Sequence, residues 1–218
     1  MKVAVVTPSR GLIHSRTVEA IRKNFLGIEK NFEWNHFISH DKPIPKAQNY
    51  LFEKAFDWGA NYIWSVEEDN VFPAHTLIKM INFAKQKEAE VVYVDYPIGA
   101  KRSSGICRKG NQILWGPMGC TLILRSALEK LDRPWFRTDK TFRIENKDPL
   151  ELIEEDIPNK YGGQDIWFGM KCKEKGIKVV QLTSILAGHV KPKGENREIN
   201  NTYEFEIWDS IKEHQRYN

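Results

Sequence analysis

Residues 61–73 read NYIWSVEEDNVFP, and the rest of the chain is organised around this stretch. Its first half is aromatic and β-branched, which favours a buried strand. The strand then runs into three consecutive acids, Glu67, Glu68 and Asp69, and Pro73 prevents a longer strand. Because side chains alternate along a strand, we expect Glu67 and Asp69 on one side and Glu68 on the other.

These adjacent carboxylates favour a ligand site. They repel one another, and burying them costs free energy unless a positive charge lies close by. Two carboxylates on one side of a strand, at the carboxyl edge of a sheet, can bind a hard divalent cation. The alternative is a solvated acidic turn between a strand and a helix, and residues 61–73 alone do not decide between the two.

Length and composition indicate one globular domain. The chain has 218 residues, of which 41% are hydrophobic and 28% are charged, which suffices for one sizeable core. We expect no membrane span and no signal peptide, and the three widely spaced cysteines fit a reducing, cytoplasmic location without a disulfide framework or zinc motif. The net charge of +4 permits an anionic ligand and does not require nucleic acid.

Strands and helices are predicted to alternate over the first hundred residues. We expect strands at 2–7, 32–38, 61–69 and 90–96, separated by helices at 15–25, 45–58 and 73–87. This alternation predicts an α/β fold with a mostly parallel sheet flanked by helices.

The second half is predicted to be less regular. We expect a hairpin (105–107 with 112–115), a strand ending at 124, a short helix (126–131) capped by its serine, and a charged loop (132–160). A helix ending at 176, a strand at 177–182, a loop at 184–193 and a terminal helix at 203–214 should follow.

Three separated segments carry candidate chemistry: the acidic strand end, the Gly-Gly-Gln-Asp run ending at Asp165, and the Ala-Gly-His run ending at His189. In an α/β sheet all three can lie at the carboxyl edge of the strands, where ligands bind. Glu67, Asp69 and His189 would then supply oxygen and nitrogen ligands that suit Mn²⁺ or Mg²⁺.

These motifs, over nearly the whole chain, resemble those of glycosyltransferases with the nucleotide-diphosphosugar (GT-A, Rossmann-like) fold, close to the inverting class of cellulose- and chitin-synthase-like enzymes. Val3–Arg10 matches the first nucleotide-binding strand, and residues 46–49 (KAQN) resemble the basic-small-x-Asn motif. Glu67–Asp69 stands where the family has Asp-x-Asp, with Glu67 as a departure. The resemblance implies a single domain, 1–218, with a nucleotide-sugar-binding half (1–96) and an acceptor-binding half (97–218).

The resemblance also implies a role for each candidate residue. Glu67, Asp69 and His189 would hold the metal, and Asp165 would be the catalytic base. The nucleotide would contact Thr7, Pro8, Ser9, Arg10, Asp41, Lys46, Asn49 and Glu68. The implied activity is transfer of a hexose-like sugar from a nucleotide-diphosphate sugar to an acceptor hydroxyl with inversion. UDP is one candidate nucleotide, but the sequence identifies neither the base nor the sugar.

Other interpretations stay open. A nucleotidyltransferase that makes nucleotide-sugars uses a related sheet, but such enzymes usually carry a glycine-rich loop after the first strand, where this chain has Gly11 alone. A binding module without catalysis would not need Asp69, Asp165 and His189 together. The acceptor could be a glycan, a carrier or a modified base in DNA, and Trp115 is expected to face it. The oligomeric state cannot be read from the sequence.

Overall fold

The computed structural model describes residues 1–28, 30–40, 42–99, 101–144, 152–156, 163–192 and 205–212. Its helices are α1 (Ser15–Phe25), α2 (Lys46–Asp57), α3 (Thr76–Lys87), α4 (Arg125–Lys130) and α5 (Gln164–Glu174). Among the described residues, none of these helices has the length and apolar character that crossing a bilayer requires.

Fifteen strands accompany the helices in the described ranges. They are β1 (Lys2–Pro8), β2 (Glu33–Ser39), β3 (Tyr62–Val66), β4 (Asn70–Val71), β5 (Val91–Asp95), β6 (Pro97–Ile98), β7 (Ser103–Ser104), β8 (Cys107–Lys109), β9 (Gln112–Trp115), β10 (Cys120–Leu124), β11 (Lys140–Ile144), β12 (Leu152–Asp156), β13 (Val179–Leu186), β14 (Gly188–Pro192) and β15 (Phe205–Trp208).

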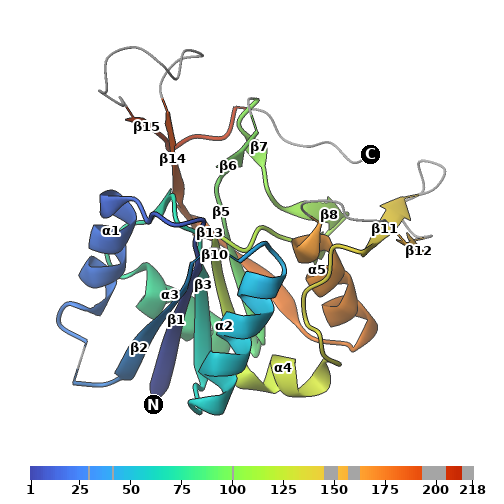
Figure 1. Ribbon diagram of the computed structural model, residues 1–218, viewed down its shortest axis with the longest axis horizontal. Coiled ribbons are helices and arrows are strands. Elements are labelled where there is room, and N and C mark those ends of the chain that lie inside the picture. Colours follow the sequence, from blue (N-terminus) through green and yellow to red (C-terminus); the bar gives the residue numbers. More distant parts are fainter. Residues whose placement is uncertain are drawn as a thin grey trace.

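The centre of the molecule is a six-stranded sheet in the order β13-β5-β10-β3-β1-β2 (Figure 1). The pairs β1–β2, β1–β3 and β5–β13 are parallel, and β10 is antiparallel to both of its neighbours. The predicted α/β fold with a mixed, mostly parallel sheet is therefore confirmed. Strands β10 and β13 come from the second half of the chain, so both predicted halves contribute to one sheet.

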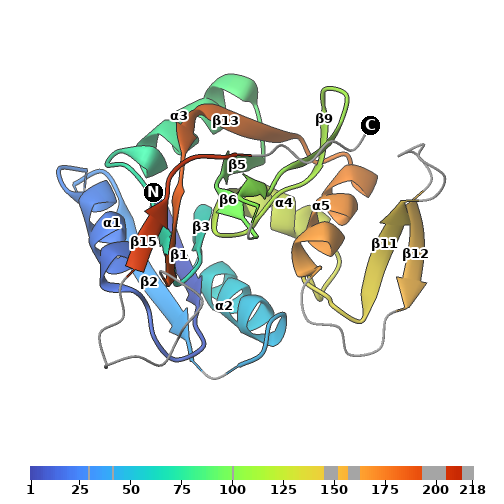
Figure 2. The same ribbon diagram turned by 90° about the horizontal axis from the view of Figure 1, so that it is seen from above.

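Helices cover both faces of this sheet (Figure 2). One buried cluster joins α1 and α3 to the face of the sheet that carries Trp64 and Val92. A second cluster joins α2, α4 and α5 to the opposite face, which carries Ile63 and Tyr93. The alternation of apolar side chains along β3 thus serves two cores, as expected for a strand at the centre of an α/β sheet.

The second half of the chain contains the main corrections to the predicted elements. Residues 184–193 were predicted as a loop, but β13 continues to Leu186 and β14 follows directly. The predicted terminal helix is wrong because 205–208 form β15, which pairs antiparallel with β14; residues 203, 204, 213 and 214 lie outside the described ranges. The predicted loop at 132–160 contains the β11–β12 hairpin. Helix α4 begins at Arg125, and Ser126 does not cap it.

Candidate functional site

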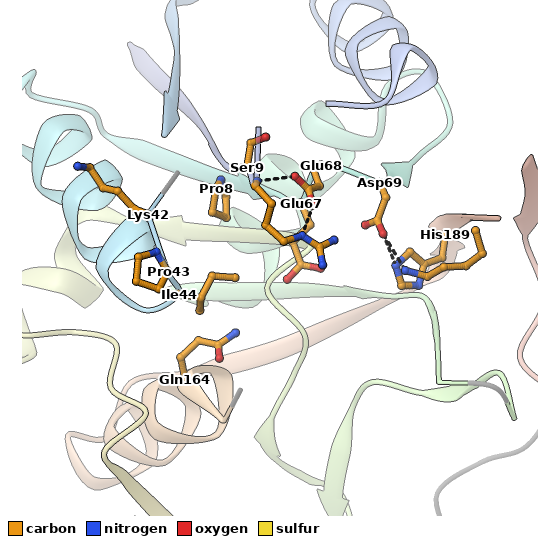
Figure 3. A pocket seen from close by; sticks show the side chains of 12 residues that line it. Pro8, Ser9, Lys42, Pro43, Ile44, Glu67, Glu68, Asp69, Gln164 and His189 are labelled. Atoms are coloured by element: carbon orange, nitrogen blue, oxygen red, sulfur yellow. Dashed lines mark hydrogen bonds and ion pairs between the residues drawn. The ribbon is translucent and has the colours of Figure 1, made fainter. Parts of the chain in front are cut away.

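A pocket opens at the carboxyl ends of β1 and β3 (Figure 3). Its walls come from five separate parts of the chain: the loop after β1, the segment before α2, the acidic turn after β3, the start of α5, and β14. The residues that line it are Pro8, Ser9, Arg10, Lys42, Pro43, Ile44, Glu67, Glu68, Asp69, Gln164, His189 and Lys191. The three segments with candidate chemistry therefore meet in one place.

Glu68 faces the loop after β1. Its carboxylate accepts the backbone N–H of Arg10 at 2.8 Å and pairs with the Arg10 Nε at 2.5 Å. Its carbonyl accepts the backbone N–H of His14 at 2.9 Å and the Thr17 hydroxyl at 3.1 Å. These bonds fix the acidic turn against the start of α1. Strand β3 ends at Val66, and beyond it Glu68 bonds to the loop after β1, whereas Glu67 and Asp69 bond to Tyr96 and to β14.

Glu67 bonds to the segment that directly follows β5. Its carboxylate accepts the Tyr96 hydroxyl at 2.8 Å, and its backbone N–H donates to the Gly119 carbonyl at 3.3 Å. Burial raises the pKa of Glu67 to about 7, and the Asp69 charge adds to this, while the Tyr96 hydroxyl opposes it. At neutral pH the neutral and the charged form of the Glu67 carboxyl group are consequently both populated.

Asp69 lies between two side chains of β14. Its Oδ2 is 3.1 Å from His189 Nε2 and 2.7 Å from Lys191 Nζ. Burial alone would raise the pKa of Asp69, but His189 and Lys191 outweigh burial and lower the pKa to about 2. Asp69 is therefore a carboxylate throughout the physiological range, in contrast to Glu67 two residues away.

His189 is oriented by its other ring nitrogen. Its Nδ1 lies 2.8 Å from the carbonyl of Pro97. A carbonyl only accepts, so Nδ1 carries the proton and Nε2 is directed at Asp69. This is the kind of outer hydrogen bond that orients a metal-ligating histidine.

The donor set fits a divalent cation in part. Within the described ranges, no three His, Cys, Asp or Glu side chains lie close enough together to hold a metal by themselves. Of the predicted trio, Asp69 Oδ2 and His189 Nε2 lie 3.1 Å apart, and the Glu67 carboxylate accepts the Tyr96 hydroxyl. An Asp oxygen and an imidazole nitrogen suit Mn²⁺ or Mg²⁺ when substrate phosphates and waters complete the coordination.

The N-terminus of α5 reaches the same pocket. Gln164, directly after Gly163 with its φ of 90°, is 8% exposed. Its Oε1 has no hydrogen-bond partner among the described residues, and Figure 3 shows its side chain across the pocket from Ser9 and Glu68. A buried acceptor without a donor is costly, so a bound ligand or water with a donor group would be favoured here.

Asp165, the predicted base, directly follows the pocket-lining residue Gln164 in the chain. It is half-buried, is not among the lining residues, and its Oδ1 accepts the backbone N–H of Ile166 at 3.0 Å. Burial raises its pKa. The carboxylate is close enough to the pocket for its charge to contribute to the raised pKa of Glu67.

The predicted nucleotide contacts divide into two groups. Pro8, Ser9, Arg10 and Glu68 line the pocket. Thr7 is buried and its hydroxyl bonds to His36 Nε2 at 2.9 Å, Lys46 is exposed at the start of α2 and does not line the pocket, and Asp41 lies outside the described residues.

Asn49 and Trp115 have structural partners. The Asn49 amide donates to the Phe136 carbonyl at 2.8 Å and accepts its N–H at 3.1 Å, which ties α2 to a segment 87 residues away. Trp115 is 8% exposed and packs in a buried cluster with Trp167 and Met170, so the expectation that it faces an acceptor is wrong.

Sequence reasoning missed six residues of the site: Tyr96, which bonds to Glu67, and the pocket-lining residues Lys42, Pro43, Ile44, Gln164 and Lys191. Tyr96 and Lys191 depend on pairings between distant segments, which no local pattern reveals. Lys191 could have been found only by recognising β14 as a strand, because His189 and Lys191 then share one face.

The sequence matches no protein family model and no curated protein. Solved structures do match in fold. A197 from STIV superposes with a TM-score of 0.58 at 17% identity, over 87% of this chain and 85% of A197. TarS from S. aureus gives 0.54 at 12% identity, over 86% of this chain and 36% of TarS.

Two further solved structures also match in fold. A structure of S. aureus TarS 1–349 in complex with UDP-GlcNAc gives a TM-score of 0.50 at 14% identity, over 94% of this chain and 62% of that one. A Bacillus anthracis protein described as a glucose-1-phosphate thymidylyltransferase gives 0.51 at 10% identity, over 87% and 89%. At such identities the likeness concerns the fold. This chain has the nucleotide-diphosphosugar transferase (GT-A) fold, which glycosyltransferases and nucleotidyltransferases share.

Proposed function

We propose that this protein is a metal-dependent glycosyltransferase that moves a sugar from a nucleotide-diphosphate sugar to an acceptor hydroxyl, with inversion. One observation carries the proposal: Asp69 and His189, 120 residues apart in the chain, meet in a pocket at the carboxyl edge of the sheet. In doubly wound sheets this edge is where nucleotides bind. The start of α5 reaches the same pocket through Gln164, and Asp165 is the next residue in the chain.

The donor would bind across the pocket with its nucleoside near Pro8, Ser9 and the 42–44 segment, and with its diphosphate toward Asp69 and His189. The TarS structure of the same fold was obtained with UDP-GlcNAc, which supports a nucleotide-sugar ligand. A Mn²⁺ or Mg²⁺ ion bound by Asp69 and His189, beside Glu67, would neutralise the charge that develops on the leaving diphosphate.

The chain's own groups would handle the acceptor and the sugar. Asp165 takes the proton as the acceptor oxygen attacks the anomeric carbon and the bond to the diphosphate breaks. Its burial-raised pKa brings it closer to the working pH of a general base. Gln164 Oε1 would accept a hydrogen bond from a sugar hydroxyl, since this acceptor is buried and unpartnered within the described residues.

A nucleotidyltransferase is the second candidate, because the thymidylyltransferase match covers both chains almost fully. The two reactions release different products. A glycosyltransferase releases a nucleoside diphosphate, and a nucleotidyltransferase joins a nucleoside triphosphate to a sugar phosphate and releases pyrophosphate.

For the proposed glycosyltransferase, a glycan or carrier is the default acceptor. A modified DNA base is the other class of acceptor to assay.

The test is a thermal-shift panel of UDP, GDP, CDP, ADP and TDP, each with and without Mn²⁺. Binding to the folded state raises Tm. We expect one nucleotide to stabilise the protein, more strongly with Mn²⁺, and Asp69→Asn to remove the Mn²⁺ increment. Asp57→Ala, an exposed acid at the far end of α2, is the matched control and should leave the panel unchanged.

Product analysis completes the test. The nucleotide-sugar of the stabilising base should be hydrolysed slowly to the nucleoside diphosphate, and Asp165→Asn should slow this release without weakening nucleotide binding. Pyrophosphate release from a nucleoside triphosphate and a sugar phosphate would favour the second candidate. If no nucleotide stabilises the protein with or without Mn²⁺, the proposal fails.

A further inference from the structure

Strand β14 brings a lysine to the oxygen at which a cation would bind. His189 pairs with Asn70 of β4, which places β14 directly beside the acidic turn. The backbone N–H of Val190 donates to the Asp69 carbonyl at 2.8 Å and fixes that position. Because side chains alternate along a strand, His189 and Lys191 point to the same side, and both reach Asp69 Oδ2.

Glu206, the acid on the neighbouring strand, pairs with other residues and not with Lys191. Glu206 lies directly opposite Lys191 in the β14–β15 pair. Its carboxylate instead accepts from Arg102 at 3.3 Å and from the Trp208 ring N–H at 2.6 Å, and Arg102 also stacks over the Trp208 ring. The Lys191 ammonium is thus directed into the pocket, where its side chain is 28% exposed.

Two basic side chains that line the pocket consequently neutralise part of its acidic charge. Arg10 pairs with Glu68, and Lys191 pairs with Asp69. A cation that binds Asp69 Oδ2 must share this oxygen with the ammonium. A diphosphate beside Asp69 would also lie beside the ammonium. An ammonium has three donors, so it can bond a phosphate oxygen while it keeps Asp69.

We infer that Lys191 binds the donor's diphosphate directly and gives this site affinity for a diphosphate without a metal. The inference rests on the proposed function and adds to it a second source of positive charge. It also implies a competition: a divalent cation and the Lys191 ammonium act on the same Asp69 oxygen, so removal of the ammonium should strengthen metal binding to the free protein.

Calorimetric titration with inorganic pyrophosphate tests the first part, since this probe needs no knowledge of the base. Wild type should bind pyrophosphate in EDTA, and Lys191→Met should bind at least about tenfold more weakly, as expected for the loss of one charge-assisted bond. The loss should be smaller with Mn²⁺ present. Lys85→Met, on the exposed side of α3, is the matched control and should bind as wild type does.

Titration of the ligand-free proteins with Mn²⁺, followed by electron paramagnetic resonance, tests the competition. Lys191→Met should bind Mn²⁺ more tightly than wild type because the ammonium no longer competes for the Asp69 oxygen. Lys191→Arg, which keeps a positive charge, should stay close to wild type in both titrations.

The outcomes separate the two proposals. Equal pyrophosphate affinity of wild type and Lys191→Met in EDTA overturns the inference, and so does wild-type binding that appears only with Mn²⁺; in both cases the proposed function stands. The second result needs no variant, so it decides even where Lys191→Met does not fold. Absence of binding of pyrophosphate and of all five nucleoside diphosphates, with and without Mn²⁺, removes the proposed function itself.

Discussion

Replacing Glu67 by glutamine should change how folding stability depends on pH. The pKa of Glu67 is raised from 4.5 to about 7, by burial first and by the Asp69 charge second. Between these values the folded protein holds a proton that the unfolded chain has released. The free energy of unfolding therefore falls as pH rises from about 4.5 to about 7. Glutamine cannot ionise, but its amide oxygen can still accept the Tyr96 hydroxyl, so this fall should disappear in Glu67→Gln.

The size of the effect follows from the pKa. A pKa that rises from 4.5 to about 7 corresponds to at most about 3 kcal/mol, at about 1.4 kcal/mol per pH unit. Glu67 is half-buried, so solvent screening reduces the expected value to roughly 1–3 kcal/mol. The variant should gain this much stability relative to wild type between pH 4.5 and pH 8.

Urea unfolding followed by tryptophan fluorescence, in EDTA and at several pH values from 4.5 to 8, measures this difference. Tyr96→Phe provides a second variant with the opposite sign. It loses the hydroxyl that lowers the pKa of Glu67, so its decline in stability should extend to higher pH. A constant stability difference between wild type and Glu67→Gln across this pH range would refute the assignment of a raised pKa.

Two further substitutions test how the site is supported. Asn49→Ala should lower the free energy of unfolding by about 1–3 kcal/mol, because it leaves the backbone N–H and carbonyl of Phe136 without their partner; unchanged stability with weaker nucleotide binding would restore the predicted contact to the nucleotide. Gly119→Ala should lower it by about 1–3 kcal/mol, because the added methyl group would overlap the Asn70 amide oxygen and the Tyr96 hydroxyl. The Gly119 N–H donates to this hydroxyl at 3.1 Å. If Gly119→Ala unfolds at the same denaturant concentration as wild type, the close contact between Gly119 and Tyr96 is contradicted.

The first half of the chain was predictable because its signals are local. Residues 2–96 alternate apolar runs with capped helical patterns, and an alternating pattern of that kind has few solutions besides a parallel sheet with helices on both faces. Ligand sites in such sheets lie at the carboxyl edge of the strands, which is why the acidic turn and the start of α5 could be assigned to one edge from the sequence. Asn49 shows where motif reasoning stops. The residue occupies the expected motif position, but its amide is used by a backbone segment 87 residues away, and no local signal reports that.

The second half was less predictable because a strand that lines a polar pocket lacks the alternating apolar residues by which strands are recognised in a sequence. In residues 188–192 (GHVKP) the side chains on one face are His189 and Lys191, and Val190 on the other face is 3% exposed. Periodicity methods search for alternating apolar positions, so a strand that offers one such position reads as a loop. The prediction therefore found His189 and missed Lys191, two residues further on the same face. A short strand of this kind is recognised by its pairing, here with β4 and β15, and pairing is a property of the folded chain.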